Sequence, residues 1–134
     1  MSLSRISFPA VFALTLTAAA PPTVDPRGDW RNTRDTVHMR VAACGEALCA
    51  TVIWASDKAK ADARKGSGQD LVGSLLLSDL RRHANGRWKG KAYVPDIDVR
   101  ASAVMVPVKP NLLRVSGCIL GGLICRTAHW HRMG

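Results

Sequence analysis

The sequence predicts an all-β fold, a small antiparallel up-and-down β-barrel of about eight strands. Short apolar or alternating segments recur along the chain, and clusters of Gly, Pro, Asn and Ser separate them at regular spacing. No stretch shows the apolar periodicity of a helix that docks on a core. The same pattern also fits a sandwich, but closure into a barrel leaves no exposed strand edge. A barrel of this size can hold one small ligand.

The N-terminal residues predict a secretory signal peptide over residues 1–19. Arg5 precedes an apolar run that starts at Phe8 and ends in alanines, the order of features found in signal peptides. The run is shorter than the roughly 20 apolar residues that span a bilayer as a helix. We expect cleavage after Ala18 or Ala19, and therefore a periplasmic or extracellular protein without a transmembrane span.

After the signal peptide, residues 20–27 form a proline-rich lead-in and residues 28–134 form one domain. The mature chain of about 115 residues is an ordinary size for a single domain.

The first half of the domain predicts three strands. One lies around Trp30. Residues 36–44 alternate between apolar and polar side chains, which indicates a half-buried strand. The CGEALC segment turns the chain, and the β-branched ATVIW segment returns from Ala50. Residues 56–70 are polar and charged; a short helix is conceivable there, but no apolar side chain recurs to dock it, so we expect a long loop.

The second half predicts the remaining strands. Residues 71–80 form an apolar segment in which Gly73 indicates a bend or bulge. Asn85-Gly86 is a strong hairpin signal because both residues tolerate a positive φ. Strands are then expected over residues 87–94 and 101–106, and a last hairpin turns at Gly121-Gly122.

The four cysteines predict two disulfides. All four lie after the signal peptide, Cys44 and Cys49 in one segment and Cys118 and Cys125 in another. An even number of cysteines in an exported protein favours disulfides over metal or catalytic thiols. The pairing within each segment is attractive because each pair flanks a glycine-containing turn, although four cysteines allow three pairings.

The chain is basic, with a formal net charge of +9. An exported basic protein meets anionic envelope surfaces rather than nucleic acid. The cations are scattered, and no aromatic side chains interleave with them in an RNA-binding pattern. We therefore expect no nucleic-acid partner.

Several segments resemble, in order, those of domain-of-unknown-function family 2147. They are Gly28-Asp29-Trp30, the CGEALC hairpin with VIW, LVGSLLL, the W-x-G-x-x-Y motif that ends at Tyr93, and GC…CRTAHWHR. The resemblance implies a secreted bacterial protein with a lipocalin-like fold. It also implies that Trp30 closes the barrel bottom under a late basic residue, for which we take Arg126 first and Arg132 as the alternative.

Two segments depart from the family. The loop after the second strand lacks the usual asparagine and aspartate residues and is rich in alanine, lysine and glycine. The YVPDIDVRASA segment lacks the usual acidic, glycine-containing turn and the second tyrosine.

Apolar and aromatic side chains supply the candidate ligand site. Such side chains line small-molecule pockets, and the candidates are Met39, Trp54, Trp88, Tyr93 and Met105. The same residues could instead fill a solid core.

Catalytic and metal-binding motifs have little support. His129 and His131 share a strand face, but a metal site needs a third ligand. Asp96 and Asp98 are typical turn residues. We therefore expect no cofactor, no metal and no catalysis, and a protein that holds a small apolar or amphipathic ligand. The alternative is a filled barrel that acts through its basic surface on the envelope or on a partner protein.

Overall fold

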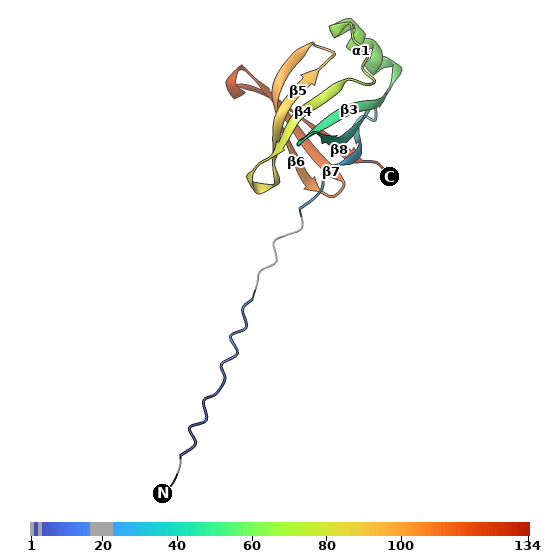
Figure 1. Ribbon diagram of the computed structural model, residues 1–134. Helices are drawn as coiled ribbons and strands as arrows, with labels where there is room; N and C mark the ends of the chain where they lie inside the picture. Colours follow the sequence, from blue (N-terminus) through green and yellow to red (C-terminus); the bar gives the residue numbers. More distant parts are fainter. Residues whose placement is uncertain (1, 3, 17–22) are drawn as a thin grey trace.

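The computed structural model describes residues 2, 4–16 and 23–134 (Figure 1). Residues 4–16 are exposed and have no regular secondary structure. The expected cleavage sites at Ala18 and Ala19 lie outside the described residues. None of the helices in the described ranges is long and apolar enough to cross a membrane.

Eight antiparallel strands close into a barrel in chain order, with β8 paired to β1, so the predicted fold class is confirmed. The strands are β1 (Gly28–Asn32), β2 (Val37–Cys44), β3 (Ala47–Ala55), β4 (Leu75–Arg82), β5 (Trp88–Val94), β6 (Val99–Lys109), β7 (Leu112–Ile119) and β8 (Ile124–Arg132). Every neighbouring pair is antiparallel. Most consecutive strands are joined by short turns, which this arrangement allows, and the connection between β3 and β4 is longer.

The barrel has two different ends. The lead-in end is where residues 23–27 enter β1, and the β2–β3, β4–β5 and β6–β7 turns also lie there. The helix end carries α1 (Asp57–Ser67) between β3 and β4, as Figure 1 shows at the top of the molecule.

Large side chains fill the barrel interior near the lead-in end. Five of them are fully buried: Trp30, Met39, Leu80, Met105 and Leu113. Trp130 and the half-buried Trp88 pack in the same cluster. Burial of a side chain of this size stabilises a fold by roughly 1.5–3 kcal/mol, so this cluster contributes strongly to stability.

Arg132, rather than Arg126, closes the barrel under Trp30. The Arg132 guanidinium lies 4.2 Å from the centre of the Trp30 ring, because the two residues are paired across β1 and β8. A Cβ atom on Gly28 would lie 2.8 Å from Nη1 of Arg132, so the glycine leaves room for the guanidinium. Arg126 is exposed and pairs with Gly117 farther along β8. The first choice of closing residue is therefore corrected.

The prediction of a long loop over residues 56–70 is wrong, since most of this segment forms α1. Ser56 caps the helix by accepting a hydrogen bond from the backbone N–H of Ala59, and Gly68 ends it in the left-handed conformation. Ala63 is buried and packs in a second cluster with Leu71. Small apolar side chains are enough to dock this helix.

The end of α1 also touches the β5–β6 turn. A Cβ atom on Gly66 would lie 1.9 Å from the backbone oxygen of Asp96. Glycine is thus required by the close approach of two backbones, and α1 covers the helix end from β3 as far as the β5–β6 turn.

Both disulfides are present and local: Cys44 bonds to Cys49, and Cys118 bonds to Cys125. The first bridges the β2–β3 turn and the second bridges the β7–β8 turn. No cysteine in the described ranges is free.

Candidate functional site

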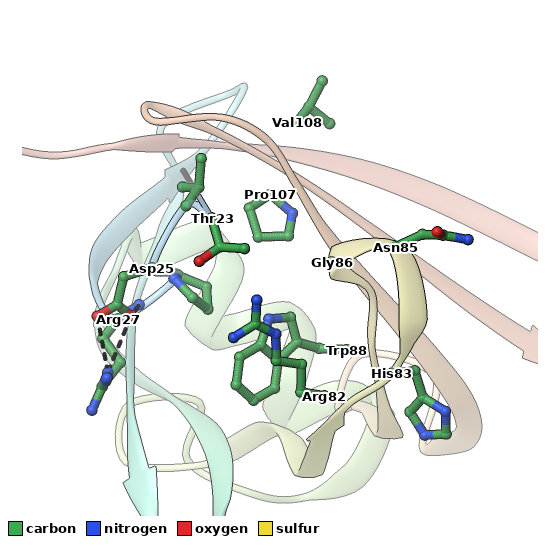
Figure 2. Close-up of a pocket in the computed structure, with 12 residues that line it drawn as sticks. Thr23, Asp25, Arg27, Arg82, His83, Asn85, Gly86, Trp88, Pro107 and Val108 are labelled. Atoms are coloured by element: carbon green, nitrogen blue, oxygen red, sulfur yellow. Dashed lines mark hydrogen bonds and ion pairs between the residues drawn. The ribbon is translucent and has the colours of Figure 1, made fainter. Parts of the chain in front are cut away.

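A half-open pocket at the lead-in end is the candidate ligand site (Figure 2). Its cavity volume is about 780 Å³, which is within the ordinary size range of small-molecule sites. Three parts of the chain form it: the lead-in, the β4–β5 turn and the end of β6. The lining residues are Thr23, Val24, Asp25, Pro26, Arg27, Arg82, His83, Asn85, Gly86, Trp88, Pro107 and Val108.

The lead-in is fixed to the barrel by side chains that donate hydrogen bonds to its backbone oxygens. Trp30 donates its indole N–H to the oxygen of Pro26 at 2.9 Å. Arg132 donates to the backbone oxygens of Arg27 at 2.8 Å and Asp25 at 2.7 Å. One wall of the pocket is therefore held by the same pair of residues that closes the barrel.

The β4–β5 turn forms the opposite wall. Asn85 and Gly86 both adopt positive φ, at 63° and 72°, as the Asn-Gly signal predicts. The turn holds Arg82 at the end of β4 across from Trp88 at the start of β5, since these two residues pair in the sheet. Figure 2 shows both side chains in the middle of the pocket.

The pocket combines an apolar surface with positive charge. Trp88, Pro107 and Val108 supply apolar contacts. Asp25 is the single carboxylate among the lining residues, and it forms an ion pair with Arg27 at 3.1 Å. Hydrogen bonds from Arg27 hold the pKa of the Asp25 carboxyl below its usual value.

Arg82 is the unmatched charge of this pocket. Its side chain has no ion-pair or hydrogen-bond partner in the part of the chain that the structure describes, and it is exposed. A guanidinium without a partner can bind a carboxylate or phosphate through two parallel hydrogen bonds. The arrangement therefore suits a ligand with an apolar body and an anionic group.

The five predicted ligand-binding residues do not share one pocket. Met39 and Met105 lie in the packed core with Trp88, and only Trp88 also lines the lead-in pocket. Trp54 lies outside the barrel, where its ring centre is 4.4 Å from that of His38. Tyr93 lines a second pocket at the helix end and donates a hydrogen bond to Asp98 at 2.6 Å.

Sequence reasoning missed Arg82, Pro107 and the lead-in as parts of a pocket. The available signal was the Asn85-Gly86 turn, which places the ends of β4 and β5 together. The position of residues 23–27 depends on Arg132 and on barrel closure, and a pattern of residue types does not reveal that.

The histidine and aspartate motifs form no metal site among the described residues. His131 is within 3.3 Å of the Thr33 hydroxyl, and His129 is exposed. The carboxylate of Asp98 accepts the Tyr93 hydrogen bond, and this bond raises the pKa of the Tyr93 hydroxyl.

The closed eight-stranded barrel, with a tryptophan at its first strand under an arginine from its last, defines a lipocalin-like fold. Protein HP1028 from the human pathogen Helicobacter pylori, which belongs to the lipocalin family, matches with a TM-score of 0.65. The match covers 84% of this chain and 85% of that chain at 19% sequence identity. At this level of sequence identity, the match shows that the two proteins share a fold and nothing more.

The chain belongs to domain-of-unknown-function family 2147. The family's sequence model, described as an uncharacterized protein conserved in bacteria, matches residues 28–132. The resemblance seen in the sequence motifs is thereby confirmed. No curated protein sequence matches the chain.

Proposed function

We propose that this protein is a non-enzymatic binding protein that holds a small amphipathic anion in the lead-in pocket. The unmatched guanidinium of Arg82 beside the indole of Trp88 is the observation that carries the proposal. The lipocalin-like fold supports it as well, because barrels of this size commonly hold a small apolar ligand.

The ligand's apolar part would lie on Trp88, Pro107 and Val108, and its anionic group would meet Arg82. We place the ligand at the barrel mouth rather than in the interior, because core side chains fill the interior around Met39 and Met105, which are completely buried.

Calorimetric titration with dodecanoate tests this proposal. The Arg82→Gln variant should bind dodecanoate about ten- to a hundredfold more weakly, because a lost charge-assisted hydrogen bond is worth about 1.5–3 kcal/mol. Neutral dodecanol should bind the wild type and Arg82→Gln equally.

Arg81→Gln is the matched control. Arg81 is adjacent in the chain, but it does not line the pocket and its Nε lies 2.9 Å from Asp79. Equal weakening by both substitutions would mean that general charge, rather than the pocket, attracts the ligand, and the proposal would fail.

We further propose that residues 1–19 direct export. The charge of Arg5, the apolar run and the small residues at its end support this proposal, and two disulfides suit an oxidising compartment. The mass of protein recovered from a bacterial periplasm should correspond to a chain that starts after Ala18 or Ala19. A mass that corresponds to a chain starting at Met1 would contradict the proposed export signal.

A second candidate function is action through the surface on the cell envelope. The packed interior around Met39 and Met105 favours it, as does the net charge of +9.

A further inference from the structure

The β7–β8 hairpin ends in an exposed apolar tip, residues 119–124, with the sequence Ile-Leu-Gly-Gly-Leu-Ile. The exposed fractions are 67% for Leu120, 84% for Leu123 and 49% for Ile124. Single exposed leucines are common on protein surfaces, but an uninterrupted apolar segment at a loop tip indicates an interaction site.

The tip stands apart from the barrel wall. β8 pairs with β1 only through residues 130–132, so residues 124–129 have a strand neighbour only in β7. Figure 1 shows this hairpin projecting from the side of the molecule. Nothing in the described part of the barrel packs over the outermost leucine, Leu123.

The tip's conformation is constrained. The Cys118–Cys125 disulfide joins the two strands directly behind it. Leu120 has a φ of 52° and is followed by two glycines with positive φ. Asparagine or glycine suits such a backbone better than leucine, so the demands of the turn do not explain an exposed leucine there.

Positive charge lies directly behind the apolar tip. A cleft of about 610 Å³ separates Leu120 and Gly121 from β5 and β6, and Lys91 and Arg100 line it. Arg100 also stacks on Tyr93, with 4.7 Å from its guanidinium carbon to the ring centre. No carboxylate is among the described residues that line this cleft. Arg126, next to the disulfide, is exposed as well.

We propose that this apolar tip inserts into the interface of an anionic phospholipid bilayer, with Lys91, Arg100 and Arg126 against the headgroups. Interfacial binding increases with the apolar area inserted and with attraction between cations and anionic lipids. Protein interfaces, in contrast, rely on aromatic anchors and polar donors, and the tip has only aliphatic side chains and glycines.

The inference deepens the second candidate function and is independent of the ligand proposed for the lead-in pocket. The tip is at the helix end of the barrel, whereas Arg82 is at the opposite end. A bound bilayer would therefore leave the lead-in pocket open to solvent.

Vesicle co-sedimentation tests the proposal with residues 23–134, which hold every strand, α1 and both disulfides. The apolar residues 8–16 are left out because they would bind lipid by themselves. We expect binding to phosphatidylcholine vesicles that contain about one third phosphatidylglycerol, and little binding to pure phosphatidylcholine.

Two variants separate the apolar and ionic contributions. Leu120→Ser combined with Leu123→Ser should lower binding to the anionic vesicles at least about tenfold. Lys91→Gln combined with Arg100→Gln should lower it about thirtyfold, since each cation near such a surface strengthens binding about fivefold. The exposed tip makes little contact with the core, so the melting temperature of the first variant should stay that of the wild type.

Matched controls come from the same chain. Val72→Ser removes another exposed apolar side chain, and Lys109→Gln removes an exposed cation at the lead-in end; neither should change vesicle binding. Arg82→Gln, which disables the lead-in pocket, should also bind vesicles like the wild type, so failure of one proposal is distinguishable from failure of the other.

Three outcomes would overturn the inference. The first is no binding of the wild type to anionic vesicles. The second is undiminished binding of the Leu120→Ser and Leu123→Ser variant, which would make the attraction purely ionic. The third is a wild-type dimer in analytical ultracentrifugation that this variant abolishes, which would show that a second copy covers the tip.

Discussion

At the scale of single residues, Arg132 connects parts of the molecule that lie far apart in the sequence. Its guanidinium donates to the backbone oxygens of Pro110, Arg27 and Asp25 and covers the Trp30 ring. It thus holds together β8, the β6–β7 turn, the lead-in and the first strand. One side chain supports both barrel closure and a wall of the candidate pocket.

Arg132→Ala should destabilise the fold by about 2 kcal/mol or more, because it leaves several backbone oxygens without a charged donor. Chemical denaturation measures this free energy of unfolding. Arg126→Ala, the control on the same strand, should change it by less than about 0.5 kcal/mol. Equal effects would contradict the closing role of Arg132.

The choice between Arg126 and Arg132 shows where residue patterns stop being informative. The two arginines are six residues apart on β8, so an alternating strand places them on the same face. Only the register between β1 and β8, which pairs Arg132 with Trp30, decides which of them reaches the ring. Register between the first and last strands depends on the geometry of the whole barrel.

The ion pair between Asp29 and Arg40 predicts a pH dependence of stability. Hydrogen bonds from Arg40 lower the pKa of the Asp29 carboxyl. A lowered folded-state pKa adds stability above the unfolded value near 4, and this stability is lost as the pH falls through the folded-state pKa. Solvent around the pair limits the contribution to less than about 1 kcal/mol.

Denaturation of the wild type and of Asp29→Asn at several pH values tests this pH dependence of stability. The wild type should be the more stable protein at neutral pH, and the difference should vanish once Asp29 is protonated. A difference that persists unchanged in strong acid would show that the ion pair is not its source.

At the scale of elements, α1 is the part that the sequence pattern failed to predict. An amphipathic helix is normally recognised by recurring large apolar residues. Here the docking residues within the helix are Ala59 and Ala63, and the larger contact, Leu71, comes after the helix has ended. The capping residues Ser56 and Gly68 were visible in the sequence and were the better signal.

Gly66→Ala should destabilise the protein by more than about 1 kcal/mol, although alanine favours an isolated helix by about that amount. The added Cβ would overlap the backbone of Asp96, so either the helix end or the β5–β6 turn must move. Thermal denaturation measures the effect, and Lys65→Ala serves as the neighbouring control. A stabilised Gly66→Ala protein would contradict the close contact.

The two hairpin disulfides should each contribute about 2 kcal/mol, since both close short loops. Cys44→Ser with Cys49→Ser, and separately Cys118→Ser with Cys125→Ser, should lower the free energy of unfolding by that amount. The denatured oxidised wild type should weigh about four hydrogens less than the reduced chain. A full reduced mass for protein from the periplasm would contradict both bonds.

At the scale of the whole molecule, the fold could be predicted because its signals are local. Alternating segments such as residues 36–44 fix which face of each strand is buried, and turn signals such as Asn85-Gly86 fix the hairpins. The candidate pocket could not be predicted in the same way, because it joins residues 23–27 to residues 82–88 and 107–108. Those contacts exist only after the barrel has closed.

The molecule as a whole presents two different ends. The lead-in end has a pocket with an unmatched guanidinium, and the helix end has an apolar tip with cations behind it. The filled core between them separates the two sites. A ligand in the first and a bilayer at the second would therefore act independently.

The most direct test of the central claim is native mass spectrometry of protein purified from a periplasm without detergent, with dodecanoate added. Our account predicts an adduct of one dodecanoate on the wild type and on Arg81→Gln that is released on denaturation, and its loss in Arg82→Gln. Equal adducts on all three proteins, or a bare wild type throughout the titration, would contradict a ligand site at the lead-in pocket.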